Sequence, residues 1–318
     1  MIEYVVKDKF IILNQSSIYF IMKKSVLQLC FLFVLVMFGF TLKAQKNVSF
    51  IAKWNASQVQ ADSIAQAFVK KYPDIKHYKV PFKRFHDKIS NQEIVLDMFI
   101  EIPKGDGPFP VVILIHGGGF IGGDKSNFTF QTFALANKGI AGISIEYRLR
   151  GHGGDYPDFN EDVMDAIDFV RQNAAKYNLD FSKLGLGGGS AGGYLSALAA
   201  MRTPECKCFI GYNGLYDVAA RALPESTEEA KKALSPILSI KNSPPATILF
   251  HGKDDTTVDC QQSVSFAKAI RDKGGKAEVI LFDGQKHGFF NKEPYLTQTT
   301  DAMVKHVLSV FNPAGRTK

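Results

Sequence analysis

A serine framed by glycines at the end of an apolar stretch constrains the fold of this chain more than any other feature. Residues 183–193 are Lys-Leu-Gly-Leu-Gly-Gly-Gly-Ser-Ala-Gly-Gly, and an alanine-rich helical pattern follows them. The Gly-x-Ser-x-Gly order is typical of a sharp strand-to-helix turn that holds a serine, here Ser190, in unusual backbone geometry. The pattern therefore predicts an α/β sheet with Ser190 as a candidate nucleophile.

The same glycines also fit a dinucleotide-binding pattern. Residues 187–192 match Gly-x-Gly-x-x-Gly, and Glu205 lies near the distance at which a ribose-binding acid would be sought. A dinucleotide-binding unit normally opens its domain, whereas several predicted strands precede these glycines. We therefore favour the serine interpretation and expect no organic cofactor and no metal.

A second glycine-rich loop follows an earlier apolar strand pattern. Residues 111–120 are Val-Val-Ile-Leu-Ile-His-Gly-Gly-Gly-Phe. Such a loop can direct backbone N–H groups toward one point, and the amide of Ala191 lies at the positive end of the helix after Ser190. We expect Gly118, Gly119 and Ala191 to form an oxyanion hole, with His116 shaping the loop through hydrogen bonds.

A serine nucleophile needs a base and a group that orients it, and hydrolases of this kind carry them in the order Ser, Asp or Glu, His. Asp254 and Asp255 both follow the predicted strand 246–251. His287 follows the predicted strand 276–282 on a glycine-flanked loop, and it is the one histidine after these acids that opens such a loop. The pattern by itself leaves both aspartates as candidates.

These motifs together resemble the α/β-hydrolase esterases of the hormone-sensitive-lipase-like and bacterial feruloyl or acetylxylan esterase type (BD-FAE-like), over roughly residues 80 to 312. The matching pieces include His116-Gly117-Gly118-Gly119, Glu146-Tyr147-Arg148-Leu149, Gly188-Gly189-Ser190-Ala191-Gly192, Ser235-Pro236, His251-Gly252-Lys253-Asp254-Asp255 and His287-Gly288-Phe289. The resemblance implies that Ser190 is the nucleophile, Asp255 the orienting acid and His287 the general base. It also implies hydrolysis of small acyl esters, with acyl groups on plant polysaccharide as one substrate class.

The order of predicted elements agrees with such a fold. Two extended runs, 78–85 and 93–102, suggest an antiparallel entry, and from residue 111 onward predicted strands alternate with helices. This alternation predicts a mostly parallel central sheet flanked by helices. We expect one catalytic domain over residues 45–318, with a short cap insertion at about 221–243.

The amino-terminal residues carry a secretory signal pattern. Met22-Lys23-Lys24 precedes an uncharged stretch from Ser25 to Leu42, and Lys43-Ala44-Gln45 follows. We expect residues 1–44 to be a signal peptide with Met22 as the true start, which predicts a secreted or periplasmic protein. The alternative is an uncleaved anchor, which would also be the only membrane association we expect.

The net charge and the cysteine content limit the kinds of binding partner that we expect. The net charge of +7 is spread along the chain without the aromatic-interleaved basic stripe of nucleic-acid binding, so no nucleic-acid partner is expected. Cys206, Cys208 and Cys260 remain after signal removal, and this odd number leaves at least one thiol free or externally paired. The oligomeric state stays open. The alternatives to an esterase are a serine peptidase-like hydrolase and a noncatalytic binding protein of the same fold.

Overall fold

The computed structural model describes residues 2–6, 9–13, 49–87, 89–218 and 227–312. The chain divides into two compact units, Met1–Lys53 and Trp54–Lys318. In the first unit, strands β1 (Ile2–Val6) and β2 (Lys9–Leu13) pair antiparallel. The predicted signal stretch from Ser25 to Leu42 lies outside the described residues.

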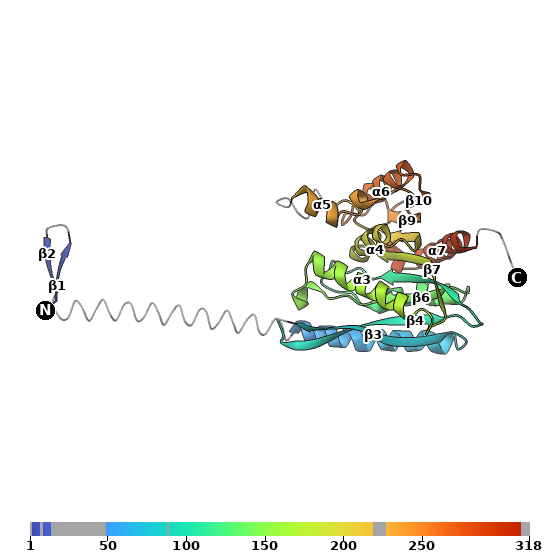
Figure 1. The fold of residues 1–318 in the computed structure, drawn as a ribbon, viewed down its shortest axis with the longest axis horizontal. Helices are drawn as coiled ribbons and strands as arrows, with labels where there is room; N and C mark the ends of the chain where they lie inside the picture. The colour runs from blue at the N-terminus through green and yellow to red at the C-terminus, as the bar shows by residue number, and fades with distance from the viewer. Residues whose placement is uncertain (1, 7–8, 14–48, 88, 219–226, 313–318) are drawn as a thin grey trace. The chain divides into compact units, whose positions relative to one another are not determined.

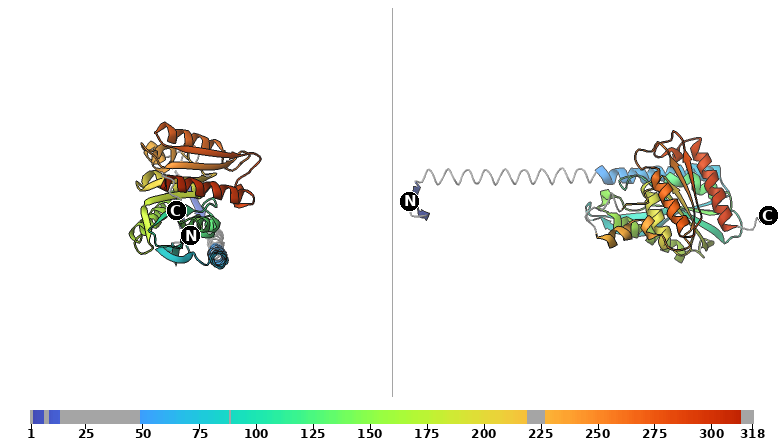
Figure 2. Two further views of the ribbon diagram at one scale, coloured as in Figure 1. Left: turned by 90° about the vertical axis from the view of Figure 1, so that its right-hand side faces the viewer. Right: turned by 90° about the horizontal axis from the view of Figure 1, so that it is seen from above.

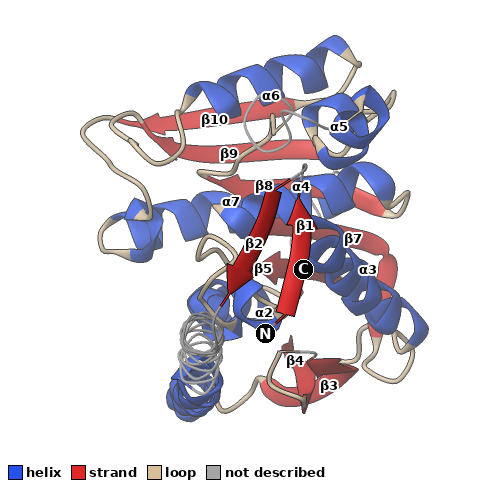
Figure 3. Cartoon of the chain, turned by 90° about the vertical axis from the view of Figure 1, so that its left-hand side faces the viewer, coloured by secondary structure: helices blue, strands red, loops and turns tan. Residues whose placement is uncertain are grey.

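One sheet organises the second unit, and its described part contains eight strands (Figures 1 and 3). Their order across the sheet is β10-β9-β8-β7-β5-β6-β4-β3. The two pairs β3–β4 and β4–β6 are antiparallel and every other neighbouring pair is parallel. The predicted mostly parallel sheet with an antiparallel entry is therefore confirmed. The strands are β3 (Lys76–Asp87), β4 (Gln92–Ile102), β5 (Phe109–Ile115), β6 (Ala141–Ile145), β7 (Leu179–Gly189), β8 (Cys206–Tyr212), β9 (Ala246–Gly252) and β10 (Ala277–Phe282).

Helices cover both faces of this sheet (Figure 2). Alternate residues of β8 show the two faces: Ile210 and Tyr212 belong to one core cluster with Met303 of α7, whereas Phe209 packs against Phe266 of α6. This arrangement follows from the period of two in a strand, which directs successive side chains to opposite faces. The α-helices are residues 49–71, α2 (Thr129–Ala136), α3 (Tyr156–Gln172), α4 (Ala191–Arg202), α5 (Glu228–Leu234), α6 (Gln261–Asp272) and α7 (Tyr295–Phe311). The 3₁₀ helices are η1 (Lys125–Phe128), η2 (Arg150–His152), η3 (Ile237–Ser239) and η4 (Phe289–Asn291).

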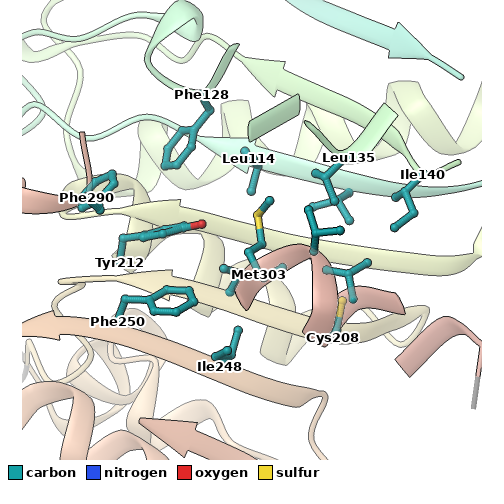
Figure 4. Packing of buried hydrophobic residues seen from close by; sticks show 14 of the residues in the cluster. Leu114, Phe128, Leu135, Ile140, Cys208, Tyr212, Ile248, Phe250, Phe290 and Met303 are labelled. Carbon is teal, nitrogen blue, oxygen red and sulfur yellow. The ribbon is translucent and has the colours of Figure 1, made fainter. Parts of the chain in front are cut away.

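The central strands are buried on both faces, which explains their continuous apolar sequence. Residues 111–115 of β5 are fully buried. A strand with one solvated face would alternate apolar and polar residues, but a parallel strand covered by helices on both sides need not. One large core cluster within the described residues joins β5, β8 and β9 to α7 (Figure 4). This rigid core supports the carboxyl ends of the strands, from which the polar loops described next emerge.

The predicted cap is only partly described. The region 221–243 contains α5 and η3, and residues 219–226 lie outside the described residues. The helix before the sheet, residues 49–71, packs Ala61 and Ala65 against Phe99 of β4. Among the described residues, no helix has the length and apolar character needed to cross a membrane.

Candidate active site

Ser190 lies in the turn between β7 and α4, with φ 53° and ψ −119°. Positive φ is costly for a residue with a side chain and is maintained only where the surroundings fix it. Here the N–H group of Ser190 donates to the carbonyl of Tyr212 at 2.9 Å. Gly192 is needed for close approach, because a Cβ there would overlap the carbonyl oxygen of Ile115 at the end of β5. The turn thus presents Ser190 at the carboxyl edge of the sheet.

The structure brings Ser190, His287 and Asp255 into one chain of hydrogen bonds. Nε2 of His287 lies 2.9 Å from Oγ of Ser190, and Nδ1 lies 2.7 Å from Oδ2 of Asp255. The side chain of His287 is 25% exposed and that of Asp255 is fully buried. When the Nδ1–H group of His287 donates a hydrogen bond to Asp255, Nε2 carries the free lone pair and can accept the proton of the serine hydroxyl.

The loop after β9 distinguishes the two candidate aspartates. Oδ1 of Asp255 accepts hydrogen bonds from the N–H groups of Thr257 at 2.8 Å and Val258 at 3.0 Å. These bonds fix the carboxylate with its other oxygen directed at His287. Asp254 is exposed, and its N–H group bonds to the carbonyl of Gln285. The contact to the histidine is therefore made by Asp255 rather than Asp254.

The predicted oxyanion loop follows β5 and borders Ser190. Gly118 has φ 110° and Gly119 has φ 62°, and a Cβ on Gly118 would overlap the carbonyl oxygen of Gly122. Among the hydrogen bonds of the described residues, none is donated by the N–H groups of Gly118, Gly119 or Ala191. Gly118 and Gly119 line the cavity beside Ser190, and Ala191 is the next residue in the chain, so these N–H groups are candidates to bind a developing negative oxygen.

His116 joins this loop to the strand beneath it. Its Nδ1 lies 2.8 Å from the carbonyl oxygen of Gly117, and its ring stacks on Tyr147 with centroids 4.4 Å apart. The hydroxyl of Tyr147 donates to the carbonyl of His116 at 3.2 Å. The structure thus gives His116 the shaping contacts expected from the sequence.

A buried ion cluster that the sequence analysis missed lies behind the same loop. Lys125 is fully buried, and its Nζ lies 2.7 Å from Oδ1 of Asp97 and 3.4 Å from Oε1 of Glu146. Oε2 of Glu146 lies 3.5 Å from Nε2 of His116. Burial alone would raise the pKa of Glu146, but the contact with His116 and the charge of Lys125 hold that pKa below its ordinary value. A lysine near a glycine loop carries no periodic signal that would reveal this burial.

A cavity of about 400 Å³ opens beside Ser190. The stacked rings of Phe128 and Phe290, whose centroids are 6.2 Å apart, line part of it (Figure 4). A Cβ on Gly189 would approach Phe290 to 2.8 Å, so these rings lie directly beside the serine turn. The other lining includes Ile121, which is 68% exposed. The full lining is Gly117, Gly118, Gly119, Ile121, Asn127, Phe128, Gly189, Ser190, Asn213, Thr257, His287, Gly288, Phe290 and Asn291.

Two further polar residues contact the hydrogen-bonded chain and were not selected from the sequence. Nδ2 of Asn213 lies 2.9 Å from Nδ1 and 3.1 Å from Nε2 of His287. His251, interpreted from the sequence as closing a strand, lies with Nε2 3.3 Å from Oδ2 of Asp255. Asn213 follows β8, and His251 lies near the end of β9 at the same edge of the sheet. This position at the strand ends is the signal in the sequence that could have identified them as site residues.

The remaining sequence candidates do not join the site. Glu205, the acid of the dinucleotide alternative, pairs with Arg171 at 3.2 Å. Cys206, Cys208 and Cys260 are all free thiols. Within the described part of the chain, no group of three or more His, Cys, Asp or Glu side chains is placed to hold a metal ion.

Comparison with known proteins agrees with this fold. Residues 96–214 match the BD-FAE family. A probable isoprenylcysteine α-carbonyl methylesterase of Oryza sativa is 30% identical over 68% of this chain and 60% of its own length. Esterase LipC of Mycobacterium tuberculosis is 27% identical over 61% of this chain and 57% of its own length. The chain thus spans about 60% of the length of these curated relatives.

Solved structures match this chain over a larger fraction of both sequences. The propionate-bound esterase Est2 of the planctomycete Thermogutta terrifontis is 26% identical with a TM-score of 0.64, and the match covers 75% of this chain and 95% of Est2. A butyrate-bound form of Est2 matches with a TM-score of 0.65. The parallel sheet, the serine turn after β7 and these similarities lead to one conclusion: the chain has the α/β-hydrolase fold and is similar to esterases of that fold.

Proposed function

We propose that this protein is a serine carboxylesterase that hydrolyses esters of short-chain carboxylic acids. The observation that carries the proposal is the hydrogen-bonded series Ser190, His287 and Asp255 at 2.9 and 2.7 Å, close to the backbone N–H groups of Gly118 and Gly119, which donate no hydrogen bond within the described residues. A neutral serine is a weak nucleophile, so a base within hydrogen-bond reach is the feature that a noncatalytic binding protein does not need.

In the proposed first half-reaction, Oγ of Ser190 attacks the ester carbonyl carbon while Nε2 of His287 takes the hydroxyl proton. The carbonyl oxygen becomes negative and is bound by the amides of Gly118, Gly119 and Ala191. Asp255 holds the imidazole in the reactive tautomer and stabilises its charged form. His287 then gives the proton to the leaving alcohol, which departs as an acyl-enzyme forms.

The second half-reaction repeats these steps with water. His287 removes a proton from a water molecule as that water attacks the acyl carbon. The same amides bind the second negative oxygen. The tetrahedral intermediate collapses, Ser190 recovers its proton from His287, and the carboxylic acid leaves.

The lining of the cavity supports a short acyl group. The leaving alcohol requires a path to solvent, which we place on the side of the exposed Ile121. We place the acyl group toward Phe128 and Phe290, whose rings line the cavity beside Gly189. The Est2 structures with bound propionate and butyrate are consistent with this class of acid.

Two exposed asparagines in the lining of the cavity support an alcohol of variable size. Asn127 and Asn291 line the cavity, so their amides are available to sugar hydroxyl groups. We therefore include acyl groups on plant polysaccharide among the proposed substrates. The methylesterase relatives favour a second candidate, in which the leaving alcohol is methanol and the acid is large.

The test is hydrolysis by residues 45–318 and by the Ser190→Ala variant of p-nitrophenyl esters from acetate to octanoate, methyl ferulate, and a peptide p-nitroanilide. Fastest cleavage of acetate to butyrate, lost by about 10,000-fold or more in Ser190→Ala, is expected. Preference for methyl ferulate would favour the methyl-ester candidate. Cleavage of the anilide alone, or no turnover by folded protein, would overturn the esterase proposal.

We also propose that the esterase is exported after cleavage behind Ala44, on the signal pattern of residues 22–45. Expression of the whole sequence in a bacterial host, followed by fractionation and amino-terminal sequencing, tests this. A mature protein that begins at Gln45 outside the cytoplasm is expected. An uncleaved chain retained in the membrane fraction would establish the anchored alternative.

A further inference from the structure

Asn213 follows β8, which lies between the two strands that supply the serine and the aspartate. Ser190 follows β7 and Asp255 follows β9, and β8 separates them in the sheet. Neighbouring strands are about 4.8 Å apart, so His287 must extend across roughly 10 Å to join the two ends. The N–H group of Asn213 bonds to the carbonyl of Phe250 on β9 at 2.8 Å, which fixes its backbone beneath this path.

The side-chain amide of Asn213 contacts the face of the imidazole. Its Nδ2 is 2.9 Å from one ring nitrogen of His287 and 3.1 Å from the other. Both nitrogens already have partners in the ring plane, since Nδ1 faces Asp255 and Nε2 faces Ser190. A third group that is equally close to both nitrogens must therefore approach from above or below the plane.

The position of Asn213 is energetically unfavourable, which indicates that the residue does not serve the stability of the fold. Asn213 is fully buried, and its Oδ1 atom has no hydrogen-bond partner within the described residues. Its φ is 38°, in the left-handed region that asparagine tolerates better than most residues. A buried polar atom without a partner is destabilising, and such exceptions gather at functional sites.

We propose that Asn213 is a positioning residue for the esterase reaction: its amide fixes the plane of the His287 ring so that Nε2 stays directed at Ser190 and Nδ1 at Asp255. The inference rests on the proposed function, because it assigns a task only if His287 is the base. Without the amide, the ring is free to tilt about its bond to Cβ. The fraction of molecules aligned for proton transfer then falls, while substrate still enters the cavity.

Two variants separate the effect of the Asn213 side-chain amide from that of its backbone conformation. Asn213→Gly removes the side chain and accepts positive φ without strain. Asn213→Asp keeps the shape and adds a negative charge beside the ring. Within the described residues, the titratable groups that already face this ring are Asp255 and, behind it, His251. Asn173→Ala is the matched control, since it removes an amide bonded to the Phe169 carbonyl on α3 at 2.8 Å.

The measurement is kcat and KM for p-nitrophenyl acetate from pH 5 to 9, with thermal melting of each variant. Asn213→Gly should lower kcat by about tenfold at every pH and leave KM within about twofold. Asn213→Asp should move the acid limb of kcat/KM to higher pH, because a carboxylate favours the imidazolium, and kcat should recover above that limb. Asn173→Ala should match the wild type in both parameters.

The outcomes separate this inference from the proposed function. Wild-type activity that survives Ser190→Ala means that the esterase assignment itself has failed. Serine-dependent activity with unchanged kcat in folded Asn213→Gly, or an unmoved acid limb in folded Asn213→Asp, overturns the role of Asn213 alone. A kcat loss in Asn213→Gly that disappears when the pH is raised would also overturn it, because a misaligned ring stays misaligned at any pH.

Discussion

His251 and Asp255 are in direct contact, with Nε2 of the histidine 3.3 Å from Oδ2 of the carboxylate that His287 also faces. His251 is held by Ser263, whose oxygen is 2.7 Å from Nδ1, and by the Val258 carbonyl, 2.9 Å from Nε2. Burial lowers the pKa of His251, so this imidazole is neutral at neutral pH. The negative charge of Asp255 therefore remains available to His287.

Asp255→Asn should remove most activity, whereas Asp254→Asn should not. The asparagine amide cannot hold Nδ1–H of His287 in the required tautomer, and losses of about 10,000-fold accompany that change in serine hydrolases. Asp254 is exposed and contacts the loop through its backbone. The measurement is kcat for p-nitrophenyl acetate in both variants. Equal losses would mean that the acid has been assigned to the wrong residue.

Phe290→Leu should shift the acyl preference toward longer chains. The leucine side chain is smaller and opens space in the cavity next to Gly189. Each methylene accommodated contributes about 1 kcal/mol or more, so the ratio of kcat/KM for hexanoate to that for acetate should rise about tenfold. Val59→Ala, at an exposed apolar residue outside the cavity, is the control and should leave the ratio unchanged. An unchanged ratio in Phe290→Leu would place the acyl group elsewhere.

Lys125→Met should destabilise the fold strongly at neutral pH. The change leaves the carboxylates of Asp97 and Glu146 without their buried cation, and breaking such a pair costs about 3 to 5 kcal/mol. Urea unfolding at pH 7.5 and 5.5 measures it, and the deficit should shrink at the lower pH because the unpaired carboxylates then become protonated. Lys104→Met, which removes the exposed Lys104–Asp74 pair, should have no measurable effect. A deficit that is the same at both pH values would contradict the electrostatic explanation.

Acid should weaken the fold through His152. Its ring lies edge-on to Trp54 and Phe85, and burial lowers its pKa to about 4. An unfolded histidine titrates near pH 6.5, so below that pH the unfolded state binds a proton that the folded state does not. The free energy of unfolding should fall by up to about 3 kcal/mol between pH 6.5 and 4 from this residue.

The variant His152→Asn isolates this contribution. Its Oδ1 can replace Nδ1 as acceptor for the N–H group of Leu149, which His152 receives at 3.0 Å. The variant is less stable at pH 7.5 because the ring is lost. Its unfolding free energy should nevertheless vary less steeply with pH between 6.5 and 4 than that of the wild type, and an identical slope would assign the acid sensitivity to other groups.

Local patterns along the chain were sufficient for most of the fold. The predicted strands 246–251 and 276–282 are observed as β9 and β10, each within one residue of its predicted bounds, since strand patterns are local properties. The resemblance to esterases selected Asp255, and the structure places that residue at His287. Asn213, Lys125 and the stacking of Phe128 on Phe290 were not predicted, because each depends on which strands become neighbours. That order is a property of the whole sheet.

The strand order also has a consequence for how the protein loses activity. β10 lies at one edge of the sheet and, within the described residues, pairs with β9 alone, yet the loop after it carries His287. Edge elements open with a smaller free energy than the centre of a sheet. Moderate urea should therefore detach the histidine while the strand beneath Ser190 remains protected from hydrogen exchange. The enzyme would be switched off by a local opening well before its core is lost.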